Sequence, residues 1–370
     1  MHSLTAQFLT GLRFDPEQAA TLRAIGEFRG RQELHYRQAP EALAGLLEVA
    51  KIESSESSNR LEGVNVPLDR IRRLVVHQAQ PRNRSEQEVA GYRDALALIH
   101  DSGREMAFTP NVLLQLHGML YQYMPNPGGR WKSTDNDIVE CRPDGTSRVR
   151  FKPVPVHLTP MAVEQLATNY ASAVQMPKLD SLIVVPLAIL DFLCIHPFTD
   201  GNGRTGRILN LLFLVEQGLL DQPVLYLSRA IIRRRTEYYR LLNAVTRDDA
   251  WEPWVLYMLD AVHDTAAWTT KKIKAIRELL RRATAHVRDH APSLYSRELV
   301  ELVFEQPYSR IGNVVDAGIA KRQTASVYLK ELCDIGVLRE MKAGREKLFI
   351  HPNLVKLLTA EDHKVPEYRV

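Results

Sequence analysis

The sequence has few cysteines and no long apolar run, and each absence excludes a class of protein. Its three cysteines, Cys141, Cys194 and Cys333, lie far apart and form no C-x-x-C pair. Neither a disulfide framework nor a zinc site is therefore predicted. The longest apolar run, Leu182 to Ile195, is interrupted by Asp191 and is too short to cross a bilayer. Because the first residues also lack a signal-peptide pattern, we expect a cytoplasmic protein with no membrane role.

The chain also lacks a strong excess of charge of either sign. It has 48 Lys and Arg against 44 Asp and Glu, a net charge of +4. This charge is too small to require a nucleic acid partner, although it leaves room for local basic patches. A length of 370 residues exceeds what one hydrophobic core usually supports, so we expect two or more domains.

Helical periodicity dominates the sequence. Residues 41–51 place leucines and alanines on one face, and a polar stretch, IESSESSNRLEG, follows them. Further helices are predicted over residues 85–99, 111–123, 159–174, 181–195, 254–290 and 297–305. Residues 125–155 break this pattern, because Asp144-Gly145 is a hairpin turn pair flanked by β-branched and aromatic residues. We predict a β-hairpin there, placed as a flap over a site.

The stretch IHPFTDGNGRTGR, residues 195–207, contains a G-x-G-x-x-G that invites a dinucleotide-binding interpretation. Such a fingerprint has to follow a strand and open a crossover helix. Here the sequence predicts a helix on each side, because Pro197 ends the first helix and Gly218 lies where the second one closes. We therefore reject the dinucleotide fold and predict a helix-loop-helix connection.

The same loop favours an anion. A loop that enters a helix N-terminus offers free backbone N–H groups and the positive end of the helix dipole. Arg204 and Arg207 lie three residues apart in the first turn, and two guanidiniums beside such a loop favour a polyphosphate. Nucleotidyl transfer also needs a proton acceptor and a carboxylate for magnesium, which His196 and Asp200 can supply. Each of these residues alone would be interpreted as a helix cap, a turn residue or a surface charge. Their combination in one short stretch indicates a phosphoryl or nucleotidyl transfer site.

The string HPFTDGNGRTGR fits every fixed position of H-P-F-x-[DE]-G-N-G-R-x-x-R and resembles the signature of the Fic (filamentation induced by cAMP) domain family. The resemblance implies a mainly α fold, with a helical Fic core and a β-hairpin flap. It implies an enzyme, a nucleotidyltransferase that moves AMP from ATP to a Ser, Thr or Tyr hydroxyl of a target protein or of itself. Some members use UTP, CDP-choline or a phosphorylated protein, and many form homodimers.

The resemblance assigns a role to each position of the motif. His196 would be the general base, and Asp200 would coordinate Mg²⁺ between the α- and β-phosphates of ATP. Arg204 and Arg207 would bind the β- and γ-phosphates. The remaining nucleotide-binding positions, which contribute backbone groups or close packing, are Gly201, Asn202, Gly203, Thr205 and Gly206.

Aromatic residues complete the predicted site. Phe198 would anchor the loop in the core. Tyr239, in preference to Tyr238, would border the adenine; the alternative is that both tyrosines pack against the helix. The flap would pair with the target segment as an added strand, with residues 131–139 as its first edge.

A second resemblance concerns SNRLEG, residues 58–63, which is similar to the inhibitory pattern [ST]-x-x-x-E-[GN] of the same family. Glu62 can pair with Arg207 and occupy the guanidinium that should hold the γ-phosphate. Alone, so short a pattern is typical of a solvated helix end. Together with an intact motif, it predicts an autoinhibited enzyme.

The C-terminal quarter resembles a winged helix-turn-helix, with Gly318 between two helices and Gly344 at the tip of a hairpin. Residues 296–352 contain nine basic and eight acidic side chains, a net charge of +1. Because DNA binding depends on neutralising several phosphates, this disfavours a DNA partner and favours a protein contact. The competing hypothesis is a Fic-type nucleotide-responsive transcriptional regulator that binds DNA through this domain.

Four parts of the chain are predicted. Residues 1–105 form an N-terminal helical region that carries the inhibitory motif, and residues 106–250 form the Fic core. Residues 251–290 form a helical connector. Residues 291–370 form the winged helix-turn-helix domain.

Overall fold

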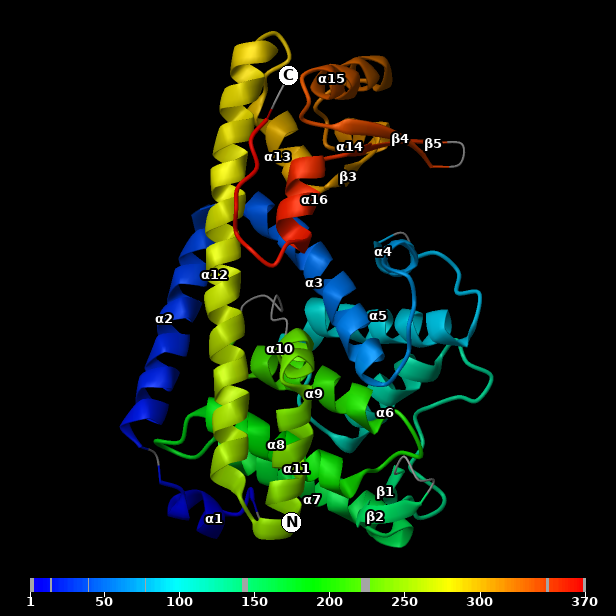
Figure 1. Ribbon diagram of the computed structural model, residues 1–370, viewed down its shortest axis with the longest axis vertical. Helices are drawn as coiled ribbons and strands as arrows, with labels where there is room; N and C mark the ends of the chain where they lie inside the picture. Colours follow the sequence, from blue (N-terminus) through cyan, green and yellow to red (C-terminus); the bar gives the residue numbers. More distant parts are fainter. Residues whose placement is uncertain are drawn as a thin grey trace. The chain divides into compact units, whose positions relative to one another are not determined.

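The computed structural model describes the chain except residues 1–2, 14, 39, 77, 142–145, 221–226, 344–345 and 369–370. The described part is mainly helical with small antiparallel sheets, as Figure 1 shows, which confirms the predicted fold class. The chain separates into two compact units. Unit 1 comprises residues 1–27 and 50–266, and unit 2 comprises residues 28–49 and 267–370.

The helices that lie wholly in unit 1 include the four that were predicted over residues 85–99, 111–123, 159–174 and 181–195, which begin and end close to those positions. Several start at a side chain that caps the helix: the Asn83 and Thr109 oxygens accept the N–H groups of Glu86 and Val112, at 3.0 and 3.2 Å. These helices are α1 (Ala6–Gly11), α4 (Leu68–Val76), α5 (Arg84–Ser102), α6 (Pro110–Tyr121), α7 (Thr159–Val174), α8 (Ser181–Ile195), α9 (Asn202–Glu216), α10 (Leu227–Arg233) and α11 (Arg235–Asp248).

Helix α8 is the centre of unit 1, because almost every one of its side chains is buried. It packs between α7 and α9, and its apolar sequence predicted this burial. Helix α9 follows it after a short loop, and Gly218 beyond its end adopts a positive φ of 61°, the conformation expected of a glycine that terminates a helix. The core of unit 1 therefore fixes both ends of the loop that carries the motif.

Helix α3 (Pro40–Leu61) corrects the prediction of a helix ending at residue 51. The polar stretch continues the same helix for almost three more turns. Its small polar side chains are buried rather than solvated, with Ser55, Ser58 and Asn59 almost inaccessible. The Asn59 amide nitrogen donates to the Ser55 carbonyl at 2.7 Å, so the helix itself satisfies this buried donor. Two other long helices, α2 (Pro16–Gln38) and α12 (Trp251–His290), also contribute residues to both units.

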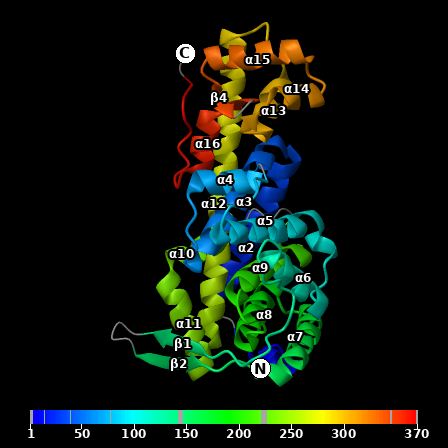
Figure 2. The same ribbon diagram turned by 90° about the vertical axis from the view of Figure 1, so that its right-hand side faces the viewer.

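The predicted hairpin is present as β1 (Ile138–Cys141) paired antiparallel with β2 (Ser147–Phe151), and Figure 2 shows it extending from the helices of unit 1. The predicted turn, Asp144-Gly145, lies outside the described residues. The prediction that the first edge begins at residue 131 is wrong, because the strand begins only at Ile138. Residues 131–136 instead bond to the loop between α8 and α9.

Unit 2 contains a three-stranded antiparallel sheet in the order β3-β5-β4, which is compatible with the predicted winged helix-turn-helix. Gly318 has a φ of 70° between α14 and α15, a conformation that favours glycine. The predicted hairpin tip, Gly344, lies outside the described residues. The elements are α13 (Arg297–Glu305), β3 (Tyr308–Ser309), α14 (Ile311–Asp316), α15 (Arg322–Asp334), β4 (Arg339–Ala343), β5 (Glu346–Ile350) and α16 (Pro352–Thr359).

Within the described ranges, no helix combines the length and the hydrophobicity that a membrane crossing requires.

The aromatic packing around Phe213 on α9 generates a stability prediction. The Phe213 ring is fully buried, stacks on Tyr170 at 4.3 Å and meets Phe108 edge-on at 5.0 Å. Phe213→Ala is expected to lower the free energy of unfolding by about 3–5 kcal/mol, because it leaves a large cavity. Urea denaturation followed by tryptophan fluorescence measures this change. Met161→Ala, at an exposed position, is the control and should change stability by less than about 0.5 kcal/mol. Equal effects of the two substitutions would contradict the assignment of Phe213 to the core.

Candidate functional site

The loop between α8 and α9 has an unusual backbone at both ends. His196 ends α8 with φ 50° and ψ 59°, a left-handed conformation that costs a non-glycine residue about 1 kcal/mol or more. Gly201 precedes α9 with φ 82°, and a Cβ there would lie only 3.0 Å from the Tyr121 ring. Gly201 is thus required for both its conformation and its close approach to Tyr121. The loop reverses the chain so that His196 and the first turn of α9 belong to one site.

Internal contacts hold this loop rigid. The Asn202 side chain accepts from the Phe198 N–H at 3.0 Å and donates to the Phe198 carbonyl at 2.7 Å. The Phe198 ring is fully buried and stacks on the His117 imidazole at 3.7 Å, as expected of an anchor. The Thr205 hydroxyl donates to the Gly201 carbonyl at 2.9 Å. Because the side chain of Asn202 is occupied by the loop, the group that it offers to an anion is its backbone N–H.

Arg204 is buried in a network that the sequence did not reveal. Its guanidinium donates to a Glu88 carboxylate oxygen at 2.7 Å and to the Tyr121 hydroxyl at 3.1 Å. Glu88 comes from α5 and Tyr121 from the end of α6, so these partners join three helices. No local pattern in the sequence identifies Glu88, because it lies more than one hundred residues from Arg204.

Arg207 is also buried, with 7% of its surface exposed. Its Nε donates to the Ser58 hydroxyl at 2.8 Å, and its terminal nitrogen donates to the Ser58 carbonyl at 3.0 Å. The same nitrogen donates to Glu62 Oε1 at 2.7 Å. Gly203 allows this approach, because a Cβ at that position would overlap with the Glu62 carboxylate. The end of α3 therefore supplies acceptors to the guanidinium that opens α9.

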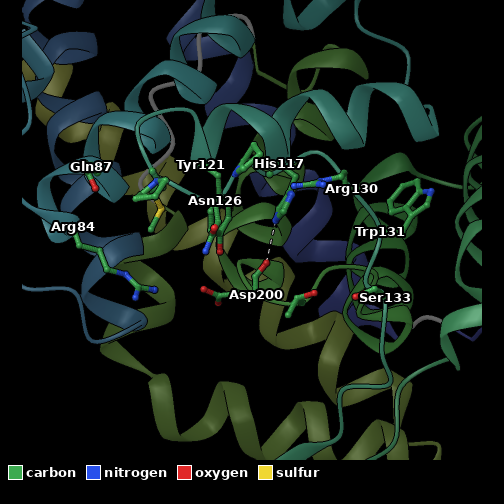
Figure 3. A pocket seen from close by; sticks show the side chains of 14 residues that line it. Arg84, Gln87, His117, Tyr121, Asn126, Arg130, Trp131, Ser133 and Asp200 are labelled. Atoms are coloured by element: carbon green, nitrogen blue, oxygen red, sulfur yellow. Dashed lines mark hydrogen bonds between the residues drawn. The ribbon is translucent and has the colours of Figure 1, made fainter.

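Asp200 lies at the edge of a cavity of about 690 Å³, as Figure 3 shows together with Arg84, Tyr121 and Arg130. Its side chain is 61% exposed, and Oδ1 accepts from the Gly201 N–H at 2.7 Å. Partial burial opposes ionisation, but the Tyr121 hydroxyl and the Arg204 guanidinium outweigh it and lower the pKa of Asp200. Asp200 is therefore an ionised carboxylate that faces solvent.

His117 supports the backbone of Asp200 and was missed by the sequence analysis. Its Nε2 bonds to the Asp200 carbonyl at 3.0 Å, and its Nδ1 accepts from the Gly129 N–H at 2.9 Å. These two partners require a neutral ring with the proton on Nε2. Burial lowers the pKa of His117 to about 4, so this tautomer persists at neutral pH.

His196 is half-buried, and its surroundings favour the neutral imidazole. Burial lowers its pKa, and the ammonium of Lys132 acts in the same direction. The Leu193 carbonyl and the carboxylates of Asp200 and Glu62 oppose them. A neutral imidazole can accept a proton at pH 7, which is the protonation state that a general base requires.

The two tyrosines considered for the adenine differ in burial. Tyr238 is buried and packs against Trp254 at 5.4 Å. Tyr239 is 37% exposed, and the Arg235 guanidinium lies over its ring at 5.7 Å. Arg235 also donates to the Leu61 carbonyl at 3.3 Å, so Tyr239 lies close to the end of the helix that leads to Glu62.

Comparison with family models gives two matches. Residues 107–214 match the Fic/DOC family, and residues 279–354 match the family described as protein adenylyltransferase SoFic-like, C-terminal domain. The first match contains the whole motif and the hairpin. The second contains α13 to α15 and the sheet of unit 2.

Similar proteins include protein adenylyltransferases from animals. The protein adenylyltransferase Fic of Drosophila grimshawi is 25% identical over 191 residues, which is 50% of this chain and 36% of that protein. That of Nematostella vectensis is 27% identical over 201 residues, 52% of this chain and 42% of that protein. The chain therefore spans less than half the length of these relatives.

Similar solved structures share the fold at low sequence identity. A Fic family protein from Desulfovibrio desulfuricans G20 superposes with a TM-score of 0.57 at 20% identity, covering 92% of this chain and 97% of that one. Fic-1 from Caenorhabditis elegans superposes with a TM-score of 0.53 at 20% identity, covering 70% and 71%. The chain carries a Fic/DOC family domain followed by a SoFic-like adenylyltransferase C-terminal domain.

Proposed function

We propose that this protein is an autoinhibited protein adenylyltransferase, which transfers AMP from ATP to a Ser, Thr or Tyr hydroxyl of a target protein and of itself. The family matches and the relatives named protein adenylyltransferases support the reaction class. The single observation that carries the proposal is the bond between Glu62 and Arg207, which joins the inhibitory pattern to the last arginine of the motif.

The reaction is a displacement at the α-phosphorus of ATP. His196 takes the proton of the target hydroxyl, and the hydroxyl oxygen forms a bond to the α-phosphorus. The bond from that phosphorus to the oxygen bridging the α- and β-phosphates breaks, and pyrophosphate leaves with that electron pair. The N–H groups at the start of α9, from Asn202 and Gly203, would stabilise the negative charge on the phosphate oxygens.

The residues present fit a magnesium ion that arrives with ATP. Asp200 offers one ionised, exposed carboxylate beside the first turn of α9. Among the described residues, no group of three or more His, Cys, Asp or Glu side chains could form an all-protein metal cage. Mg²⁺ commonly binds through one or two carboxylates together with substrate phosphates. The ion would neutralise phosphate charge, and the role of Asp200 is to hold it.

Autoinhibition follows from the competition for Arg207. Its guanidinium is buried, and the acceptors that it contacts belong to Ser58, at the end of α3, and to Glu62, which follows the helix. A γ-phosphate that bound the terminal nitrogen of Arg207 could displace the Glu62 carboxylate, which would break a charge-assisted hydrogen bond. If the carboxylate stayed in place, the phosphate and the carboxylate would be two anions in contact. ATP therefore binds weakly or with its phosphates in an unproductive position.

The hairpin is proposed to align the target. Val139 and Val149 face one another across the two strands, and both are exposed. A target segment could pair with the edge of this hairpin as an added strand, aligned by main-chain hydrogen bonds. It would then present its hydroxyl toward the loop between α8 and α9. Tyr239, exposed near the end of α3, is proposed to border the adenine.

Removal of the inhibitory carboxylate is expected to activate the enzyme. Glu62→Gly should raise automodification about tenfold to a hundredfold, since a hydrogen bond to a charged group is worth about 1.5–3 kcal/mol. Transfer of label from α-labelled ATP in the presence of Mg²⁺ measures the rate. Glu56→Gln, on the helix that precedes Glu62 and paired with Arg60 at the surface, is the control and should leave the rate at the wild-type level.

A second comparison tests the chemistry. Adding His196→Ala to Glu62→Gly should return the label to background, because no residue then takes the proton. Equal labelling of wild type and Glu62→Gly would contradict autoinhibition. Undiminished labelling in the double variant would contradict the role of His196.

The pH dependence reports on the same histidine. Because the pKa of His196 is lowered, the neutral form persists below the ordinary histidine pKa of about 6.5. In Glu62→Gly, kcat/KM for ATP is expected to fall at low pH with an apparent pKa below this ordinary value, because protonation of His196 removes the base. Initial rates from about pH 5 to about pH 8 provide the measurement. An apparent pKa above about 6.5 would show that the imidazole has a raised pKa instead.

A further inference from the structure

Residues 131–136 run along the loop between α8 and α9 before the hairpin begins. The Trp131 ring stacks on Phe198 at 5.5 Å. The Asn136 amide donates to the Phe198 carbonyl at 2.8 Å. The Lys132 N–H donates to the Pro197 carbonyl at 2.9 Å. This segment is therefore a scaffold for the loop and not a strand of the flap.

Within this segment, Lys132 bonds to the residues on either side of His196. Only 4% of the residue is exposed. Its Nζ donates to the Asn136 Oδ1 at 2.8 Å and to the Ile195 carbonyl at 3.3 Å. Together with the backbone bond to Pro197, these contacts mean that the carbonyls on both sides of His196 accept a hydrogen bond from one residue.

These hydrogen bonds to the Ile195 and Pro197 carbonyls are important because the backbone of His196 has an unfavourable conformation. Its left-handed conformation persists only where the surrounding structure determines it. The Ile195 carbonyl belongs to the last turn of α8, where carbonyl groups lack helical partners and the helix dipole is negative. A buried ammonium at this point satisfies the carbonyl and matches the dipole.

We infer that Lys132 is a positioning residue for His196: its buried ammonium fixes the carbonyl before the histidine and places a positive charge beside the imidazole. The inference rests on the proposed function, since it concerns the residue expected to take the proton. Both oxygens that Lys132 Nζ contacts are neutral. The charged group that acts on this ammonium is the Asp135 carboxylate, which opposes the effect of burial on the pKa of Lys132.

The charged groups around His196 come from three parts of the chain. Lys132 lies before the hairpin, Asp200 lies on the loop and Glu62 follows α3. Burial and Lys132 lower the pKa of His196, whereas the Leu193 carbonyl, Asp200 and Glu62 raise it. Loss of the ammonium leaves the two carboxylates unopposed by that charge, which shifts the balance toward the imidazolium.

The test is the titration of His196 in the full chain by NMR of histidine-labelled protein. The resonance is assigned by its disappearance in His196→Ala. Lys132→Met removes the charge and the donor at similar length, and it is expected to raise the pKa of His196. Lys132→Arg should keep it near the wild-type value. Lys356→Met, which removes an exposed lysine from α16, is the matched control and should leave the pKa unchanged.

A second readout uses activity in the Glu62→Gly background. There, Lys132→Met should move the acid limb of kcat/KM upward by the same shift that NMR measures. A raised His196 pKa without AMP transfer in any variant would uphold the role of Lys132 and refute the proposed reaction. An unchanged His196 pKa with active transfer would refute the role of Lys132 alone.

A substitution that retains the lysine covers the case in which Lys132→Met does not fold. Asn136→Asp places a carboxylate against the ammonium and offsets its charge. It is also expected to raise the pKa of His196. If the His196 pKa matches wild type in each of these variants that folds, Lys132 has no positioning role.

Discussion

A guanidinium buried at the start of a helix needs an anion beside it, and the arrangement of this site depends on that requirement. Arg207 cannot be solvated, because packing around α9 leaves little of it exposed. In this structure Ser58 and Glu62 satisfy it. A phosphate could satisfy this guanidinium equally well, because a phosphate, like the Glu62 carboxylate, presents negatively charged oxygens. Under the proposed function, this one buried charge makes the inhibited and the nucleotide-bound states alternatives, because Glu62 and the γ-phosphate compete for the same guanidinium.

The sequence predicted what is local and missed what depends on packing. The helix-loop-helix around the motif follows from Pro197 and the apolar periodicity on each side, and the bounds of α7 and α8 were predicted correctly. Glu88, His117 and Lys132 were not identified, because each meets the loop through the tertiary fold. The polar stretch after residue 51 was misjudged since its serines and asparagine are buried in the helix, a context that composition does not reveal.

Unit 2 contains a sheet that is compatible with a winged helix-turn-helix, but two of its side chains argue against a DNA partner. On its hairpin, Lys347 pairs with Glu340 at 2.7 Å, so this lysine is not free for a phosphate. On α15, the apolar side chain of Val327 is 58% exposed. DNA affinity depends on clustered positive charge, whereas an exposed apolar side chain on a helix is more useful at a protein surface. These features favour a protein contact for the SoFic-like domain.

The most direct measurement compares the affinities of ATP and AMP by isothermal titration in two proteins that both carry His196→Ala, with and without Glu62→Gly. If the Glu62 carboxylate competes with the γ-phosphate for Arg207, its removal should tighten ATP binding about tenfold or more and leave AMP binding unchanged. An equal gain for both nucleotides, or no gain for ATP, would show that Glu62 does not act on the γ-phosphate position.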